Sequence, residues 1–499
     1  MAYNQILKVT QVSKVPKKEI FAPDNTQVSA QNPQFKAPKN VRSTEESTGS
    51  EEPYVMINTV PIAGIQKMII DETGTIPTIK ITFIDVTGAI SGPNYPKNDP
   101  IMSVYIKTAN DKFKPISADF LITSIKSTLD PTEDPAGVGI NATYVMSGEL
   151  YVPKLYNNFS KSYPSIGSVG AMRQLAKDLD LGFSELDIET NDIMTWINPN
   201  RNGLWMIDHV AKHSYLNENS FFDAFIDRYY NLTFINVANQ LIEQKEFDVT
   251  YLNHADGSGV YANQRMKEQE EINWQEDVTY VTLTNDDRFR GRPEFITNFL
   301  LEGEVGRVLK SKGFRKQIEY YDHILEGEEK KTSFWINSAQ IEGKNEDTRL
   351  IPKDQTLQEN LIKYWINIDY GNNHREWNAS SAINDHNLAE LNKVKLKVET
   401  LGVNHQIVRR ASVPIMIFKT VQQAIDQESY IKQTAGDYSS KLNDQDLQNF
   451  ITDPYLSGTY YNSGVRIIFD AADRMSQLKT EFHFRRMNWF PEKNNTGDA

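Results

Sequence analysis

Short runs of alternating apolar and polar residues, separated by turn-forming residues, dominate the sequence from residue 54 to about residue 155. In Thr78–Phe83 the apolar side chains alternate with threonine and lysine, which is the two-residue period of a strand with one buried face. Clusters of Gly, Pro and Asn divide this run from similar runs on both sides. Strands at this regular spacing predict a β-barrel or a β-sandwich over residues 54–155.

The next segment changes to a helical period. One face of a predicted helix collects the apolar residues Val169, Met172, Leu175, Ala176 and Leu179, and Gly182 follows where a left-handed residue would end the helix. A second helix is predicted from Asn202 to about Tyr215, with Asn198 or Asn202 as its N-cap, followed by two strands around Arg228 and Tyr229. Strand-like runs return after residue 290, whereas residues 368–393 are interpreted as a long polar connection.

These changes of pattern divide the chain into four parts. They are a flexible N-terminal arm at 1–53, a first β domain at 54–155, an inserted α/β region at 156–290, and a second β domain with a closing hairpin at 291–499. The arm is too rich in polar residues and proline to bury the apolar surface that would offset its ordering entropy. We expect either a flexible tail or an arm that becomes ordered against a neighbouring subunit.

Composition excludes several classes of function. The net charge of −13 argues against neutralisation of nucleic-acid phosphates. The absence of cysteine excludes disulfides, thiolate nucleophiles and cysteine-bound metals. No apolar run reaches the roughly 18–20 residues of a membrane span, and the N-terminus lacks the apolar centre of a secretory signal. We therefore expect a soluble protein, made in a reducing cytoplasm, with no membrane insertion.

The strongest candidate for a metal site is the pair His209 and His213, which lie four residues apart on one face of the second helix, beside Asp208. A zinc-peptidase helix needs Glu directly after the first histidine as its general base. Val210 occupies that position, so the motif fails. We expect both imidazoles to lie on a helix face that is free for solvent or for a neighbour.

Acidic pairs and nucleotide motifs give no better support for an enzyme. Asp223 and Asp227 flank an apolar triplet, and Asp286 and Asp287 are adjacent, but spacing along one strand does not build the two-carboxylate cleft of a glycosidase. The sequence also lacks a phosphate-binding loop and a dinucleotide-binding glycine motif. We therefore assign no catalytic residue, no cofactor-binding residue, no metal ligand and no cofactor.

The most informative string is TNDIMTWINPN, which follows an amphipathic helix ending in Leu-Gly and precedes a second helix and the strand pair FIDRYYNLTFINV. In this order the segments resemble the central hub proteins of contractile-tailed bacteriophage baseplates. The residues that carry the resemblance are Asn191, Asp192, Trp196, Asn198, Pro199, Asn200, Asp227, Tyr229, Tyr230 and Asn236. The closing segment with Arg485, Arg486 and Trp489 also resembles the last hairpin of such proteins.

This resemblance implies a mostly β, α+β fold with two tail-tube-like β-barrel domains and inserted α/β modules. It also implies a homotrimer in the virion tail baseplate, whose pseudo-sixfold ring joins the sixfold tail tube to the threefold central spike. The partners would be the tube, spike and wedge proteins, and DNA would pass through an acidic lumen without specific binding. The alternatives are a tube initiator or wedge component, a cell-wall hydrolase of the tail tip, and a cellular binding protein unrelated to phage.

Overall fold

The computed structural model describes most residues between 53 and 242 and shorter stretches before and after them. The described residues are 8–15, 53–86, 88–90, 92–106, 116–131, 140–185, 189–242, 280–281, 296–303, 315–322, 331–336, 361–368, 373–374, 376–392, 394–402, 409–410, 412–416, 458–472 and 478–486. Asp286, Asp287 and Trp489 lie outside these ranges.

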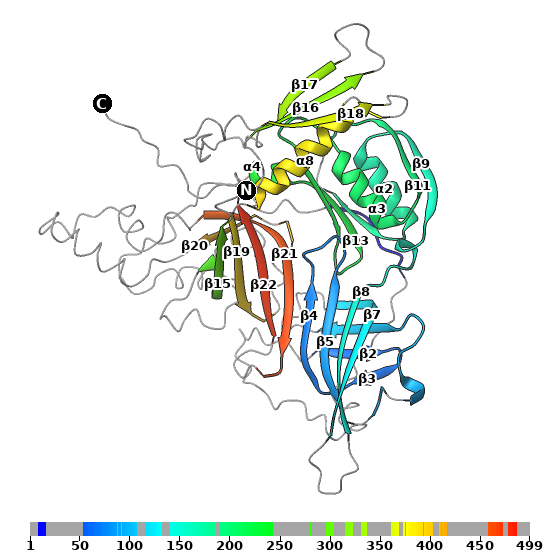
Figure 1. Ribbon diagram of the computed structural model, residues 1–499. Helices are drawn as coiled ribbons and strands as arrows, with labels where there is room; N and C mark the ends of the chain where they lie inside the picture. Colours follow the sequence, from blue (N-terminus) through cyan, green and yellow to red (C-terminus); the bar gives the residue numbers. More distant parts are fainter. Residues whose placement is uncertain are drawn as a thin grey trace, which may run out of the picture.

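The first β unit is a series of antiparallel strands in the spatial order β4-β5-β8-β7-β6-β2-β3 (Figure 1). Its strands are β2 (Tyr54–Ile57), β3 (Val60–Ile62), β4 (Ile65–Asp71), β5 (Thr78–Asp85), β6 (Ile101–Ile106), β7 (Ile116–Pro131) and β8 (Ile140–Leu150), with a short 3-10 helix η1 (Gly92–Asn94) before β6. In β5, Ile79, Ile81 and Phe83 are buried and the residues between them are not. The two-residue period predicted for this strand is therefore confirmed.

The second β unit comes from the C-terminal part of the chain. Its strands are β14 (Tyr280–Val281), β15 (Ile296–Gly303), β19 (Val394–Leu401), β20 (Ser412–Met416), β21 (Gly458–Asp470) and β22 (Leu478–Arg486). The main order is β15-β19-β22-β21, and β20 pairs with both β21 and β14. Its buried core includes Leu396, Val398, Val465, Phe482 and Phe484. The same alternation of buried and exposed residues therefore builds both units.

The two units are joined edge to edge, because β21 pairs with β4 in an antiparallel ladder. Within the described residues they form one 13-stranded sheet, drawn from blue at one end to red and green at the other in Figure 1. The fold is α+β and mostly β, with large antiparallel sheets, so the predicted fold class is confirmed.

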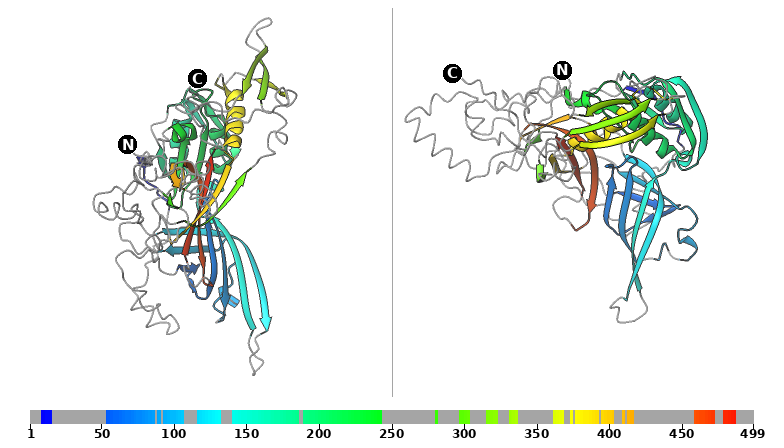
Figure 2. Two further views of the ribbon diagram at one scale, coloured as in Figure 1. Left: turned by 90° about the vertical axis from the view of Figure 1, so that its left-hand side faces the viewer. Right: turned by 45° about the horizontal axis from the view of Figure 1, so that its top comes forward.

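A mixed α/β module lies beyond the tips of the strands of the first unit, above β4, β5 and β8 in Figure 1 (see also Figure 2). Its sheet has the order β1-β10-β13-β12, and β9 and β11 form a separate two-stranded ribbon. The elements are β1 (Lys8–Gln11), η2 (Pro153–Leu155), β9 (Phe159–Ile166), α2 (Ser168–Asp178), β10 (Gly182–Glu185), β11 (Met194–Arg201), α3 (Gly203–His213), β12 (Phe222–Ile226), β13 (Asn231–Asn236) and α4 (Val237–Ile242). The two predicted helices and the predicted strand pair are confirmed.

The N-terminal segment contributes an edge strand to this module. Val9 of β1 pairs with Ser184 of β10, in an antiparallel register. Beyond the strand, the amide of Lys14 donates to the carbonyl of Asp180 at 2.7 Å, and Val15 is buried. Part of the segment predicted as an arm is thus docked on a region more than 150 residues away in the sequence.

Gly182 does not end α2, as the sequence had suggested. The helix ends at Asp178, and Asp180 adopts the left-handed conformation with a φ of 60°. Gly182 instead begins β10, where an added Cβ would lie 2.1 Å from Oδ1 of Asn231 and 3.0 Å from the carbonyl oxygen of Gln11. A glycine is required there because β1 and a neighbouring side chain approach the backbone closely.

The interpretation of residues 368–393 as a polar connection is wrong, because this stretch contains the helix α8 (Trp377–Leu391). The helix packs against α3, and its buried side chains include Ser380, Asn384 and Asn387. A helix that buries amides and hydroxyls shows no apolar stripe, so periodicity does not reveal it. Near α8, a small sheet of order β17-β16-β18 is formed by β16 (Arg315–Asp322), β17 (Lys331–Ile336) and β18 (Leu361–Ile368) (Figure 1).

Candidate functional site

The pairing of β4 with β21, which we call the seam, is the contact that makes one continuous sheet from two units. Its register places Arg466 opposite Asp71, and Asp470 opposite Lys67. The sheet continues without interruption from β21 to β22, where Arg466 faces Glu481. One arginine therefore lies between a carboxylate of the first unit and a carboxylate of the second.

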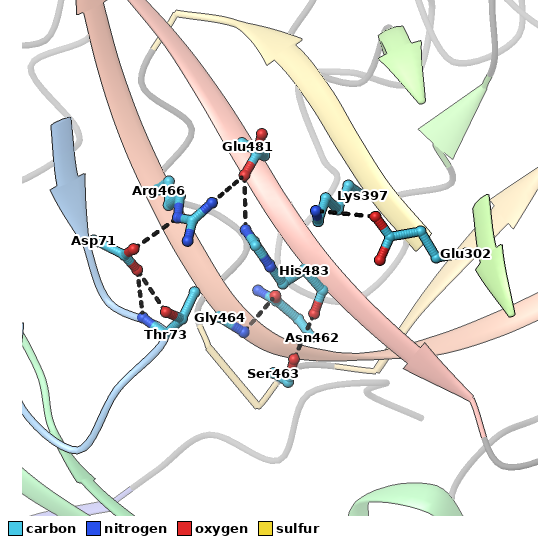
Figure 3. A network of polar contacts seen from close by, with 10 residues as sticks. All are labelled: Asp71, Thr73, Glu302, Lys397, Asn462, Ser463, Gly464, Arg466, Glu481 and His483. Carbon is cyan, nitrogen blue, oxygen red and sulfur yellow. Dashed lines mark hydrogen bonds and ion pairs between the residues drawn. The ribbon is translucent and has the colours of Figure 1, made fainter. Parts of the chain in front are cut away.

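Charged hydrogen bonds connect these side chains across the seam (Figure 3). The guanidinium of Arg466 donates from Nε to Asp71 at 2.7 Å and from Nη1 to Glu481 at 3.2 Å. Glu481 also lies 2.7 Å from Nε2 of His483. Hydrogen bonding from His483, followed by Arg466, lowers the pKa of Glu481. Charge-assisted bonds of this kind fix orientation as well as adding stability.

Asp71 shows how strongly this network favours the charged state. Burial alone would raise the pKa of its carboxyl, but hydrogen bonds from Thr73 and Arg466 bring it below its usual value. Thr73 donates both its backbone amide and its hydroxyl to Oδ1 of Asp71, at 2.9 and 2.7 Å. Asp71 and Glu481 therefore both carry their charge at neutral pH, hydrogen-bonded to the guanidinium between them.

A second polar cluster lies where the α/β module meets both β units. We call Glu72, Asp223, Arg228 and Arg409 the junction cluster. Nε of Arg228 lies 2.7 Å from Oε1 of Glu72, and both side chains are less than a tenth exposed. Arg409 places its guanidinium 4.0 Å from the ring centroid of Phe225 and 3.4 Å from Oδ2 of Asp223. The cluster thus combines the first β unit, the module and the C-terminal part of the chain.

Arg409 also binds the backbone of the turn that follows β4. Its Nη1 donates to the carbonyl of Glu72 at 3.2 Å and to the carbonyl of Gly74. Next to it, burial lowers the pKa of Arg410 to about 10 and raises the pKa of Tyr461. Burying this much charge costs free energy unless each group is paired. The arrangement is that of a structural joint between parts of the chain.

The histidine pair predicted on α3 lies beneath α8, so the expectation of a free helix face is wrong. The ring of His213 stacks on Trp377 with centroids 3.6 Å apart and an angle of 2°. His209 stacks on Trp205 at 4.4 Å and meets Trp377 edge-on at 5.1 Å. The helix that covers these imidazoles was hidden in the polar sequence after residue 368.

Burial keeps both imidazoles neutral. It lowers the pKa of His209 to about 4 and that of His213 to about 3, and the charge of Lys212 acts in the same direction. Among the residues that the structure describes, no group of three or more His, Asp or Glu side chains is placed to hold a metal ion. The aromatic and histidine side chains form a packing surface between two helices.

Three side chains that sequence reasoning missed hold α8 on the end of α3. Asn384 donates from Nδ2 to the carbonyls of Ala211, Lys212 and Ser214, at 2.7–3.2 Å. The carbonyl of His213 accepts from the hydroxyl of Ser380 at 3.1 Å and lies 2.9 Å from Nε2 of His374. Carbonyls at a helix end need such partners. The only sequence signal was the spacing of Ser380 and Asn384, one helical turn apart.

The carboxylates considered as a catalytic pair serve structural roles. Asp223 is the ion-pair partner of Arg409. Asp227 accepts from the amides of Tyr229 and Asn231 at 2.8 and 2.9 Å, which closes the tight turn between β12 and β13. Burial raises the pKa of Asp227.

The TNDIMTWINPN segment likewise fixes backbone geometry. Asp192 accepts from the amide of Ser168 at the start of α2 and from the amide of Tyr215 after α3, at 2.9 and 3.0 Å. The indole of Trp196 donates to the carbonyl of Ile166 at 3.0 Å. Of the two predicted N-caps, Asn202 accepts from Trp205 at 2.9 Å, whereas Asn198 bonds to the backbone of Arg201.

Solved structures similar to this chain include phage tail proteins. A tail protein from Neisseria meningitidis is 11% identical, with a TM-score of 0.44, and 88% of this chain and 98% of that chain are covered. The 43 kDa tail protein of prophage MuSo2 from Shewanella oneidensis is 7% identical, with a TM-score of 0.48 and coverage of 89% and 100%. An E. coli component of the type VI secretion system, described as structurally similar to T4 tail proteins gp27 and gp5, is 9% identical, with a TM-score of 0.36 and coverage of 88% and 77%.

No protein-family model matches the chain, and no curated protein matches it. In the part of the chain that is described, the helices are all too short or too polar to cross a membrane.

Proposed function

We propose that this protein is a structural component of a contractile tail, the central hub of its baseplate. The observation that carries the proposal is the seam, because it makes two β units in one chain behave as adjacent segments of one curved sheet. The order of motifs around TNDIMTWINPN supports the same assignment. On this proposal the domains at 54–155 and 291–499 are the two tube-like domains, residues 156–290 are inserted between them, and β16–β18 with α8 are a further insertion within the second.

The geometry suits an adaptor between sixfold and threefold symmetry. Three chains with two β units each supply six similar segments to a ring, while the chain itself repeats only three times. The junction cluster supports this role because two ion pairs, Arg228 with Glu72 in a buried position and Arg409 with the partly exposed Asp223, link the module to the first β unit and to the C-terminal part of the chain. We propose the tail tube, the central spike and the wedge proteins as partners, and the virion tail as location.

One face of the joined sheet, which we call the polar face, carries ion pairs between neighbouring strands. They join Lys67 to Asp470 at 3.6 Å and Lys479 to Glu399 at 3.1 Å. A surface of this kind suits the wall of a channel through which DNA passes. Charges neutralised in this way offer DNA little attraction. We propose that this face lines the opening of the ring, and that DNA passes it without specific binding.

The role is mechanical rather than enzymatic on this proposal. The acidic pair singled out from the sequence is engaged in an ion pair and a turn, and the histidine pair is engaged in packing. No observation favours a hydrolase over a structural role. A tube initiator would be distinguished by a sixfold assembly.

The test is the mass of the purified protein, measured by light scattering across a concentration series. The chain mass is 57.1 kDa, and we expect a species of three times that mass. Electron microscopy of the same sample should show a ring with six similar lobes around a central opening. A strict monomer at every concentration, with the purified spike protein added, would overturn the hub assignment.

A further inference from the structure

The joined sheet contains an uninterrupted path of strands, β7-β8-β5-β4-β21-β22-β19-β15, that runs through both β units. Every neighbouring pair along it is antiparallel. Its two ends, β7 and β15, lie at opposite sides of the sheet in Figure 1. The contacts that these two ends make decide whether the sheet stops or continues into another molecule.

Both ends present strand edges that lack a partner within the described residues. β6 pairs with β7 only from Ile116 to Leu121, so the rest of β7 is paired on one side alone, by β8. In the described part of the chain, β15 pairs only with β19. An unpaired strand edge carries a row of free amide and carbonyl groups and is a ready template for another strand.

Exposed apolar side chains occur on these same strands. Leu129 on β7 is 62% exposed and Leu300 on β15 is 51% exposed. On the face shared with Leu129, β15 carries the half-buried Phe299 and Leu301. Large apolar side chains on an unpaired edge indicate a surface that is covered in an assembly.

Strand parity makes the two edges compatible with each other. Directions alternate along a path of eight strands, so β15 runs opposite to β7. In a ring with cyclic symmetry every chain has the same orientation. If β15 of one chain lies beside β7 of the next, the new pair is therefore antiparallel, like every other pair on the path.

Side-chain faces also agree. Directly paired residues lie on the same face of a sheet. The registers of the successive strand pairs from β15 to β7 therefore place Leu300 on the same face as Lys126 and Thr128 of β7. Phe299 and Leu301 lie on the opposite face, together with Ile125 and Leu129. If β15 of one chain pairs with β7 of the next, the polar side chains of both chains therefore stay on one face of the extended sheet and the apolar side chains stay on the other.

We propose that β15 pairs with the distal half of β7, residues Thr123–Leu129, in a second copy of this chain, and that this contact closes the ring. The inference rests on the proposed function and specifies which surface makes the subunit interface. The contact is head-to-tail, because two different edges meet, and such contacts close into a ring when the rotation between chains allows it. It has the same form as the seam, an antiparallel edge-to-edge ladder, but it joins two molecules.

Engineered cysteines give a direct test, because the chain has none of its own. Leu300→Cys is combined in turn with Ser124→Cys, Lys126→Cys and Thr128→Cys, three positions on one face that sample successive registers of an antiparallel pair. After mild oxidation, a non-reducing gel should show disulfide-linked dimers and trimers for at least one pair. The matched control joins Leu300→Cys to Ile197→Cys, an exposed position on β11, and should stay at chain mass.

Charge substitutions provide the second readout. Leu300→Asp and Leu129→Asp should each convert the trimer to monomers in light scattering while the far-ultraviolet circular dichroism is kept. Ile197→Asp, at a comparably exposed apolar side chain away from both edges, should leave the trimer intact. A wild-type trimer that shows no interchain disulfide in any pair, and that survives both charge substitutions, would overturn this interface while leaving the hub proposal standing. A wild-type protein that stays monomeric at every concentration, with the purified spike protein added, would instead remove the proposed function itself.

Discussion

Arg409 contacts more parts of the fold than any other residue of the junction cluster. Its guanidinium meets the turn after β4, the aromatic ring of Phe225 and the carboxylate of Asp223. Removal of one partner from a buried charged cluster leaves the others uncompensated, which costs more than the pair contributes when intact. Loss of Arg409 would therefore destabilise the fold mainly because the carbonyl of Glu72 and the carboxylate of Asp223 would each lose a partner.

We therefore expect Arg409→Ala to lower the free energy of unfolding by roughly 3 kcal/mol. Urea denaturation followed by tryptophan fluorescence measures the change. Lys212→Ala is the matched control, because its ion pair with Asp385 at 3.3 Å is about half exposed, and exposed pairs contribute roughly 0–1 kcal/mol. Equal effects of the two substitutions would contradict a special role for the junction cluster.

We expect the partly buried imidazoles on α3 to give the protein a defined response to acid. Their folded-state pKa values, about 4 for His209 and about 3 for His213, lie below the value of roughly 6.5 in an unfolded chain. Both states are neutral above pH 6.5, so stability is unaffected there. Below that pH the unfolded chain binds protons that the folded chain does not, so stability falls as the pH decreases toward 4.

Melting temperatures measured between pH 7 and pH 5 test this response. We expect the wild-type protein to lose stability over that interval, and the double variant His209→Gln/His213→Gln to show a flatter profile. The slope is the readout, since the variant also loses the stacking on Trp377 and will start from a lower melting temperature. An unchanged slope would mean that these imidazoles do not determine the acid response.

At the scale of single elements, α8 and β1 are both held by hydrogen bonds to the backbone of distant parts of the chain, α8 through its side chains and β1 through strand pairing. The end of α3 depends on Asn384 of α8, whose amide also accepts the backbone N–H of Phe222 at 2.9 Å. The edge of β10 depends on β1. Neither element has an amphipathic sequence pattern from which it could be predicted, because the contacts that stabilise each one are made with residues far away in the sequence.

Asn384→Ala should destabilise the protein by about 2 kcal/mol, since several buried carbonyls and one buried amide lose their partner. Asp385→Ala, the adjacent and exposed position on the same helix, should change stability by about 0.5 kcal/mol or less. Chemical denaturation of the two variants side by side separates the capping role from a general effect of helix composition.

Gly182→Ala should displace β1, because the added methyl group would meet Asn231 and the backbone of Gln11. Faster cleavage within residues 8–15 under limited proteolysis is the expected result. Gly74→Ala serves as the control, since the nearest atom to its Cβ would lie 3.6 Å away, an ordinary contact. Equal cleavage of both variants would show that β1 does not depend on this close approach.

For the whole molecule, local periodicity was enough to predict most strands of the first β unit and the helices α2 and α3, because each has one buried face, but it did not single out β4. It did not predict α8, whose buried face is polar, or the docking of β1, which depends on a distant edge. It also did not predict the seam, since β4 and β21 are almost 400 residues apart and their pairing rests on tertiary contacts. The candidate histidines were found, but their environment depended on the helix that was missed.

The seam has a consequence for the kinetics of assembly. A six-segment ring made from single-unit proteins requires five successive bimolecular encounters, each dependent on concentration. On the hub proposal, every second junction of the ring is formed within one polypeptide, at an effective concentration that dilution does not change. Three chains would then need two encounters to complete the ring instead of five, so the proposed hub could form at low copy number, before a protein present in many copies begins to polymerise on it.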